Sequence, residues 1–393
     1  MLKKCNTRLQ QSYGGVAPAG LRCDHWCMAL LSRSSVTRVA AAIVVVLLVG
    51  PSPVPLTGST QPVRARHAMV VSQDSLASQV GERVLRDGGN AVDAAVAVAF
   101  ALAVTYPTAG NIGGGGFLVY RPFEGEPAAY DFREMAPATA FQTMFMRGDE
   151  YDRVLHHNGH LAVGVPGTVA GLHLAWFEYG SLPWERLVAP AIRLARDGFV
   201  VSQALASSLA GVLPRMADYP ASVAQFSNGG VPYRAGEILR QGDLASTLSR
   251  IAAQGPLGFY AGETAELMAR EMAAHGGIMT KGDLAGYSAV RRAPLVGTYR
   301  GVDVISMPPA SSGGATVIQM LNILEGYDLA GSGSGSATTT HVIIEAMRRA
   351  YADRAFHLGD PAFNPGMPID RLVSKEYAVE LRGTIDLNEA SAS

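Results

Sequence analysis

The chain has 393 residues, of which 48% are hydrophobic and 17% are charged, and its formal net charge is −1. This length suffices for one large domain or two to three ordinary ones, and the hydrophobic share suffices for a sizeable core. The balanced charge lacks the basic excess that nucleic-acid-binding proteins use, and the aliphatic and aromatic content excludes global disorder. We therefore expect a compact protein with no nucleic-acid partner.

The first distinct segment is a twelve-residue apolar run at residues 39–50, which follows Arg33 and Arg38. A membrane span needs about 20 apolar residues, whereas a shorter run behind basic residues is typical of a secretory signal. We expect residues 1–38 to be an extension and the basic start of the signal, and residues 51–66 to hold the cleavage region and a linker. The mature protein is then exported, to the periplasm or the cell exterior, without a stable membrane anchor. A buried core segment is the alternative interpretation of the run.

A conventional signal begins at Met28, which makes Met28 a candidate for the true start of translation. All three cysteines, Cys5, Cys23 and Cys27, precede the apolar run. A mature chain without cysteine has neither a disulfide nor a thiol nucleophile. Cys23, His25 and Cys27 lack a fourth ligand at a usual spacing, so we expect no metal site there.

From residue 67 onward, apolar residues mostly recur at helical spacing, and glycine or proline stands at most junctions. Leu76, Val80 and Val84 mark the first helix, and an entirely apolar run at residues 94–104 predicts a second helix that is buried all round. We expect helices at 76–84, 94–104, 165–179, 184–197, 202–213, 245–253, 261–275, 316–327 and 341–357, strands at 117–120, 128–132 and 302–307, and a flexible stretch at 331–336. These elements predict an α+β fold with more helix than strand.

Four consecutive glycines, Gly113 to Gly116, lie between a predicted helix and a predicted strand. A phosphate-binding loop has the opposite order, strand, loop and helix, and its usual spacing of glycines is missing here. We therefore expect no nucleotide site. The glycines indicate close backbone approach, either to a ligand or to another element of the chain, and the sequence leaves both open.

A nucleophile is not evident from the residues alone. The chain has no G-x-S-x-G motif, and Ser311 and Ser312 lie in a predicted loop, residues 308–314, without a histidine at a recognisable offset. The hydroxyl and amide groups of this loop suit an anion, but they suit ordinary helix capping equally well.

Three histidines lie close together in the sequence: His156, His157 and His160. Asn158 and Gly159 interrupt any helix that could align them, and no acidic residue accompanies them. We expect a solvated loop here and no metal site.

Arg133 lies at the end of a predicted strand, in the segment DFREMAP at residues 131–137. A guanidinium group can hold a carboxylate through two parallel hydrogen bonds, which lysine cannot reproduce. The alternative is a structural ion pair with Asp131 or Glu134.

Several segments of the chain, taken together, resemble the γ-glutamyltranspeptidases, or glutathione hydrolases, of the N-terminal-nucleophile hydrolase superfamily. The resemblance covers roughly residues 67–387, in the order of the family. Its segments are GGNAVDAAVA (88–97), NIGGGGF (111–117), DFREMAP (131–137), GVPGTVAGL (164–172), ARDGF (195–199), GPLGFYAG (255–262), MPPASSGG (307–314) and EAMRRAYADRAFHLGDP (345–361).

The resemblance implies a four-layer αββα sandwich, of which residues 67–393 form the large-subunit part, completed by strands of a small subunit. It implies a precursor that cleaves itself, and a new N-terminal threonine of the small subunit that attacks the γ-glutamyl amide of glutathione and related compounds. Water, an amino acid or a peptide then accepts the glutamyl group. The threonine's own α-amine can act as base, so no cofactor or metal is implied. Arg133 corresponds to the arginine that holds the substrate's α-carboxylate.

The family's nucleophile motif, Thr-Thr-His leading into a strand, is expected beyond Ser393, so we expect no catalytic residue in this chain and no activity of the chain alone. Thr340 and His341 match the motif in letters, but the residues after them have a helical pattern, which excludes Thr340 as the nucleophile. The alternatives are a cephalosporin-acylase-like or polyglutamate-processing homologue, and a non-catalytic protein that keeps only the carboxylate site.

Overall fold

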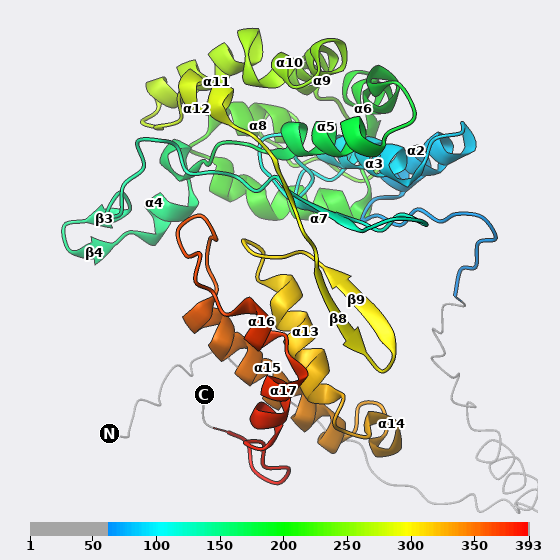
Figure 1. Ribbon diagram of the computed structural model, residues 1–393. Coiled ribbons are helices and arrows are strands. Elements are labelled where there is room, and N and C mark those ends of the chain that lie inside the picture. The colour runs from blue at the N-terminus through cyan, green and yellow to red at the C-terminus, as the bar shows by residue number, and fades with distance from the viewer. Residues whose placement is uncertain (1–61, 392–393) are drawn as a thin grey trace, which may run out of the picture. The chain divides into compact units, whose positions relative to one another are not determined.

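The computed structural model describes residues 62–391, and Ala65–Ser393 form one compact unit. The predicted export signal, Met28 and the three cysteines lie outside the described residues. Within these residues the fold is α+β and richer in helix than in strand, as the sequence predicts (Figure 1). None of its described helices combines the length and the apolar character that crossing a membrane requires.

The first two helices form a hairpin at the start of the unit. Helix α2 (Ser75–Arg86) and helix α3 (Ala91–Thr105) pack against each other. A capping box starts α3: the Asn90 side chain accepts from the backbone of Asp93, and the Asp93 carboxylate accepts from the Asn90 N–H at 2.9 Å. The Asp93 carboxylate also accepts from the Ser181 N–H at 3.0 Å, so this buried charge is fully partnered.

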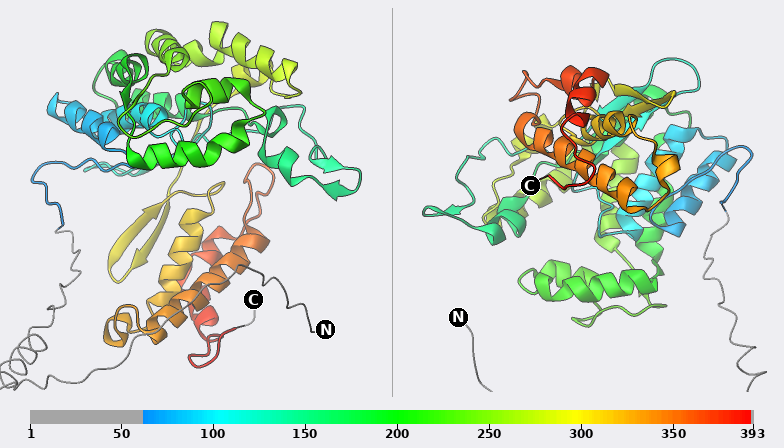
Figure 2. Two further views of the ribbon diagram at one scale, coloured as in Figure 1. Left: turned by 180° about the vertical axis from the view of Figure 1, so that it is seen from behind. Right: turned by 90° about the horizontal axis from the view of Figure 1, so that it is seen from below.

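The other helices follow at short intervals (Figures 1 and 2). They are α4 (Arg153–His157), α5 (Thr168–Tyr179), α6 (Trp184–Asp197), α7 (Gln203–Val212), α8 (Pro220–Phe226), α9 (Gly242–Gln254), α10 (Leu257–Tyr260), α11 (Gly262–Ala274), α12 (Lys281–Gly286), α13 (Gly313–Leu324), α14 (Leu329–Ser332), α15 (Ala337–His357), α16 (Ile369–Leu372) and α17 (Lys375–Arg382), with 3-10 turns at His160–Ala162 and Leu213–Met216.

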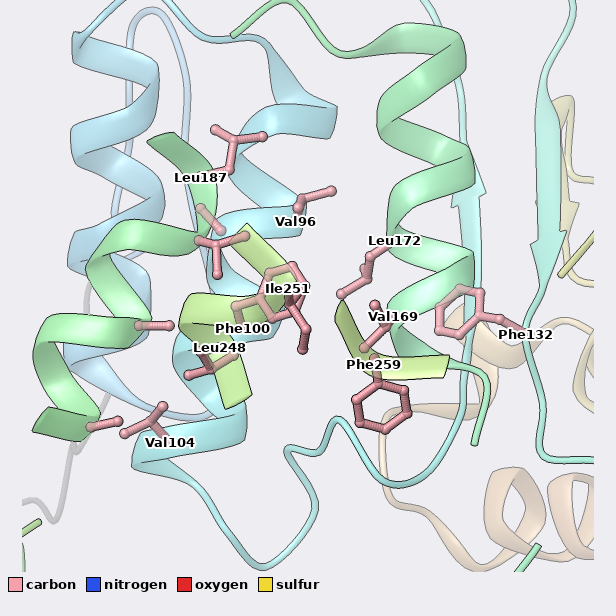
Figure 3. Packing of buried hydrophobic residues seen from close by; sticks show 14 of the residues in the cluster. Val96, Phe100, Val104, Phe132, Val169, Leu172, Leu187, Leu248, Ile251 and Phe259 are labelled. Carbon is pink, nitrogen blue, oxygen red and sulfur yellow. The ribbon is translucent and has the colours of Figure 1, made fainter. Parts of the chain in front are cut away.

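The main core lies among α3, α5, α6, α9 and α10 (Figure 3): α3 packs on α5 and α6, and α9 packs on α6 and α10. Phe100 of α3 is fully buried and meets the Trp184 ring edge-on, with 5.5 Å between the ring centroids. The Trp184 indole N–H donates to the Ile251 carbonyl at 2.9 Å, so its one polar group is satisfied. Because α3 is surrounded by other elements, its side chains are apolar all round. Most of them are small, which allows the neighbouring helices to approach closely.

The largest sheet among the described residues has three antiparallel strands in the order β1 (Phe117–Tyr120), β2 (Ala128–Asp131) and β7 (Val290–Arg292). The register pairs Phe117 with Asp131 and Asp131 with Val290. The central strand β2 is buried along its whole length, whereas β1 is an edge strand, with Phe117 and Val119 exposed. Strand β7 was not predicted from the sequence.

The remaining strands form two-stranded pairs: β3 (Met146–Arg147) with β4 (Glu150–Tyr151), β5 (Phe199–Val200) with β6 (Ile238–Leu239), and β8 (Leu295–Tyr299) with β9 (Val302–Ser306). Helix α13 packs on the β8–β9 hairpin, on α15 and on α17. The Gly297 backbone leaves room for Ile318, because a Cβ at this glycine would lie 2.6 Å from an Ile318 methyl group.

The prediction of a flexible stretch at residues 331–336 is wrong at its beginning, where α14 ends. The Asp328 side chain caps this short helix by accepting from the Gly331 N–H at 2.9 Å. The end of the stretch is also ordered, since Ser336 caps α15 by accepting from the Thr339 N–H at 3.1 Å. Helix α15 therefore starts one turn before the predicted position.

Candidate active site

Arg133 lies two residues after the end of β2, and hydrogen bonds fix both its backbone N–H and its carbonyl. The Arg133 N–H donates to the Asp131 carboxylate at 3.2 Å, and the Tyr287 hydroxyl donates to the Arg133 carbonyl at 2.9 Å. Burial raises the pKa of Tyr287, and its neighbour Tyr260 adds to the effect, so this hydroxyl stays a neutral donor. The Tyr260 and Tyr287 rings stack with 5.8 Å between their centroids.

Three glycines allow this packing around Phe132 and Arg133. A Cβ at Gly115 would lie 2.5 Å from the Phe132 carbonyl oxygen, and a Cβ at Gly167 would lie 2.1 Å from both that oxygen and the Tyr287 hydroxyl. A Cβ at Gly171 would lie 2.0 Å from the Phe132 ring. At Gly115 the glycine run therefore allows another part of the chain, the backbone at Phe132, to approach closely. Of the two possibilities that the sequence left open, a ligand or another element of the chain, the second holds for this glycine.

The carboxylate of Asp131 is taken by another arginine. The Arg292 Nε atom lies 2.7 Å from Asp131 Oδ2, and the Asp131 side chain is only 9% exposed. Arg133 makes no ion pair within 4.0 Å in residues 62–391, either with Asp131 or with Glu134, and its side chain is exposed. The structural ion pair considered for Arg133 is therefore not formed, and its guanidinium group is free to meet a ligand.

Arg133 lines a cavity of about 740 Å³. The cavity is lined by Phe117, Arg133, Glu134, Ala310, Ser311, Ser312, Arg354, Ala355, Leu358, Gly359 and Asp360. Four segments of the chain meet here: the start of β1, the residues after β2, the loop before α13, and the end of α15 with the residues after it. This volume lies within the range typical of small-molecule sites.

The loop before α13 contributes its two serines to the cavity. The Ser312 hydroxyl accepts a hydrogen bond from Arg354 Nε at 2.9 Å, and the Ser311 hydroxyl accepts from the Gly313 N–H at 3.3 Å. Neither serine is hydrogen-bonded to a histidine within the described part of the chain, so this loop lacks the base that would activate a serine.

A second cavity, of about 770 Å³, lies between α2 and α6. Two of its arginines, Arg83 and Arg186, pair with the same Asp87 carboxylate at 3.1 Å and 3.2 Å. Its third arginine, Arg193, forms no ion pair within 4.0 Å in residues 62–391. In the smaller cavity both arginines, Arg133 and Arg354, are free of such pairs among the described residues, so this cavity is the better candidate for binding an anion.

A comparison with known protein families identifies the group to which the chain belongs. Residues 77–393 match the family model of gamma-glutamyltranspeptidase. The chain belongs to this family. The match confirms the resemblance noted in the sequence and covers most of the described unit.

Individual relatives agree with this assignment. The chain is 49% identical, over 338 residues, to a glutathione hydrolase proenzyme of Escherichia coli strain K12, a match that covers 84% of this chain and 57% of the relative. It is 39% identical, over 353 residues, to an acylase ACY 1 proenzyme of Pseudomonas sp. strain SE83, covering 87% of this chain and 63% of the relative. The chain thus spans little more than half the length of these relatives.

Solved structures confirm the fold. The crystal structure of Helicobacter pylori gamma-glutamyltranspeptidase matches with a TM-score of 0.82 and 44% identity, covering 84% of this chain and 95% of that chain. A cephalosporin acylase from Bacillus halodurans matches with a TM-score of 0.75 and 31% identity, covering 84% of this chain and 63% of that chain. The α+β fold of the gamma-glutamyltranspeptidase family is therefore the fold of this chain.

The histidines of this family member differ from the predicted solvated loop. His156 and His157 end the short helix α4, and the His156 ring contacts the Phe145 ring at a tilt of 41°, with 4.6 Å between the centroids. His160 has an acidic partner after all, because Glu271 of α11 lies 3.3 Å from its Nε2 atom. Glu271 is 111 residues away in the sequence, which is why local spacing missed it. In residues 62–391 no group of three or more His, Cys, Asp or Glu residues could hold a metal ion.

Thr340 lies inside α15, which begins at Ala337, one turn before the helix predicted from residue 341. Its backbone N–H donates to the Ser336 carbonyl at 2.9 Å, within the first turns of a 21-residue helix. A threonine in a helix is not the start of a strand, so the prediction that Thr340 is no nucleophile rests on a confirmed helix.

Proposed function

We propose that this chain is the large subunit of a γ-glutamyltransferase and glutathione hydrolase, and that Arg133 holds the α-carboxylate of the γ-glutamyl donor. The observation that carries this proposal is the unpaired Arg133 guanidinium in the 740 Å³ cavity. Its planar fork matches a carboxylate through two parallel hydrogen bonds. The names of the relatives, several of them glutathione hydrolases, support the reaction class.

The nucleophile of this reaction is an N-terminal threonine of a small subunit, supplied by a segment outside these 393 residues. The threonine hydroxyl attacks the γ-carbonyl carbon, the C–N bond breaks, and the amine leaves with the proton that the threonine's α-amine has taken up. Water or the amine of an amino acid then attacks the glutamyl ester and releases the threonine. The proenzyme names of the relatives support a precursor that is cleaved.

The small subunit covers apolar surface that this chain exposes. On α15, Ile344, Met347 and Tyr351 follow one another at helical spacing and are 47%, 42% and 52% exposed. Strand β1 has an open edge in the described sheet, with Phe117 exposed beside Arg133 in the cavity lining. Apolar patches and free strand edges of this kind mark docking surfaces. Residues 67–393 form the large-subunit domain, and an N-terminal signal directs its export.

The test is hydrolysis of a γ-glutamyl anilide by this chain assembled with its small subunit. We expect turnover by the assembly, none by the 393-residue chain alone, and a loss in the Arg133→Ala variant of about 2–5 kcal/mol of donor binding, since a charge-assisted pair is removed. Turnover by the chain alone that survives Arg133→Ala would refute both assignments.

A second candidate is an acylase. The 39% identity to acylase ACY 1 and the match to a cephalosporin acylase support it. A cephalosporin side chain with a terminal carboxylate presents the same group to Arg133 as a γ-glutamyl donor does. Competition between glutathione and such a cephalosporin on the assembled protein separates the two. A polyglutamate-processing enzyme prefers a polyglutamate donor in the same assay, and a non-catalytic carboxylate-binding protein turns over none of them.

A further inference from the structure

We propose that Arg354 forms a second anion subsite, which holds a carboxylate on the leaving-group side of the donor, such as the glycine carboxylate of glutathione. This inference rests on the proposed function and extends it, because it assigns a preference for donors that carry two carboxylates. Arg133 and Arg354 both line the 740 Å³ cavity, one from the end of β2 and the other from α15.

The Arg354 guanidinium is held in place but not neutralised. Its Nε atom donates to the Ser312 hydroxyl at 2.9 Å, and its Cζ atom lies 5.9 Å from the centroid of the Tyr351 ring. Arg354 makes no ion pair within 4.0 Å to any carboxylate in the described residues, and its two Nη groups make no hydrogen bond there. A guanidinium group carries five N–H donors, so four remain for a ligand.

Two neighbouring arginines on α15, Arg348 and Arg349, differ from Arg354 because both pair with an acid of their own helix. Arg349 Nη1 lies 2.6 Å from the buried Glu345 carboxylate, and Arg348 Nε lies 3.9 Å from it. Asp353, the acid next to Arg354 in sequence, accepts from the Tyr377 hydroxyl and from the Gln319 side chain instead. Arg354 is thus left without an acidic partner although its helix carries two acids.

The acids in the cavity lining are likewise not paired with Arg354. Asp360 accepts from the Ala362 N–H at 2.9 Å through its Oδ1 atom, and Glu134 follows Arg133 on the other wall. Neither forms an ion pair within 4.0 Å with Arg133 or Arg354. Two unpaired guanidinium groups on two walls suit a ligand with two separated anionic groups. A donor with only the α-carboxylate uses Arg133 alone.

The experiment compares glutathione with its C-terminal amide, which differs only in the second carboxylate, in the assembled protein. We expect the wild type to prefer the acid by about tenfold in kcat/KM, mainly through KM. The amide loses the charge-assisted hydrogen bond between Arg354 and the second carboxylate, and solvent at the exposed Arg354 limits what this bond contributes. Arg354→Ala abolishes this preference, and Arg354→Lys keeps part of it. Arg133→Ala weakens both donors.

Arg270→Ala is the matched control, because Arg270 is exposed on α11, outside the cavity lining, and its loss changes the net charge equally. We expect it to leave the acid preference intact. Arg354 is exposed, and Arg354→Gln, which retains most of its stem, gives a second variant if the alanine variant folds poorly.

Three results would overturn the inference: no preference for the acid in the wild type, equal losses for acid and amide in Arg354→Ala, or loss of the preference in Arg270→Ala. A wild-type assembly that turns over neither donor refutes the proposed function instead, and the inference falls with it.

Discussion

The buried Glu345 carboxylate on α15 gives the sharpest stability prediction. Its side chain is only 1% exposed, and it accepts from Arg349 Nη1 at 2.6 Å, from the Ser391 hydroxyl at 2.5 Å and from the Ser391 N–H at 3.1 Å. Arg349 also donates to the Thr384 carbonyl at 2.7 Å. Glu345 thereby fastens the last described residues of the chain to the middle of α15.

Replacing Glu345 with alanine leaves the Arg349 charge half-buried without its carboxylate. Breaking a buried pair in this way costs about 3–5 kcal/mol. We expect the free energy of unfolding, measured by urea denaturation, to fall by this amount in Glu345→Ala. The Glu345→Gln/Arg349→Met double variant should lose clearly less than the sum of its single variants, because it leaves no unpaired charge.

The pH dependence follows from the same contacts. Hydrogen bonds from Ser391 and Arg349 lower the pKa of Glu345 from 4.5 to about 2. A carboxyl whose pKa is depressed in the folded state stabilises that state above its unfolded pKa and loses this contribution as the pH falls through its folded pKa. The stability difference between wild type and Glu345→Gln should therefore be full above about pH 4.5 and shrink toward pH 2. Two results would refute this account of Glu345. One is a loss of less than about 1 kcal/mol in the free energy of unfolding of Glu345→Ala at pH 7, and the other is a stability difference between wild type and Glu345→Gln that does not change below pH 4.5.

Three further predictions concern the residues that hold Arg133. Tyr287→Phe removes one neutral hydrogen bond to the Arg133 carbonyl, so in the assembled protein we expect about a fivefold higher KM for γ-glutamyl donors with little change in kcat; an unchanged KM contradicts the role. Gly167→Ala places a methyl group 2.1 Å from the Phe132 carbonyl oxygen and should cost at least about 1–3 kcal/mol in thermal or urea unfolding, whereas Gly113→Ala, with nothing within 4 Å, should be tolerated; equal costs contradict the packing argument. Asp131→Asn removes the charged partner of Arg292 and should lower the free energy of unfolding by about 1.5–3 kcal/mol, and a neutral effect at neutral pH argues against this ion pair.

The helices of ten or more residues were predictable because their signals are local, whereas the shorter helices α4, α8, α10, α12, α14, α16 and α17 were not predicted. The apolar run at residues 94–104 predicts a helix buried all round, and the capping box of Asn90 and Asp93 starts that helix three residues earlier, at Ala91. The end of α3 at Thr105 agrees with the predicted boundary to one residue. In contrast, the start of α15 was placed too late, because its first turn, from Ala337, consists of threonines behind a polar stretch rather than of apolar residues.

The pairing of distant segments was not predictable. Strand β7 has three residues, and it joins β2 across about 160 positions, where no periodicity in the sequence connects them. The contact between His160 and Glu271 of α11 was unpredictable for the same reason, since 111 residues separate them in the sequence. The cavity could not be predicted either, since it forms only where four separate segments meet.

Ion pairs between arginines and buried carboxylates decide which arginines of this chain remain available to bind a ligand. The sequence left two interpretations for Arg133, and the deciding residue is Arg292, which takes the Asp131 carboxylate from 161 positions away. On α15, Glu345 binds Arg349 in the same way, and Arg354 remains unpaired. A buried carboxylate costs free energy unless its charge is partnered. Asp131 and Glu345 each fix one arginine as structural in this way, whereas the buried Asp93 is partnered by backbone N–H groups and by Ser181. The arginines that no buried acid claims are then the ones at which binding is to be sought, and in the cavity these are Arg133 and Arg354.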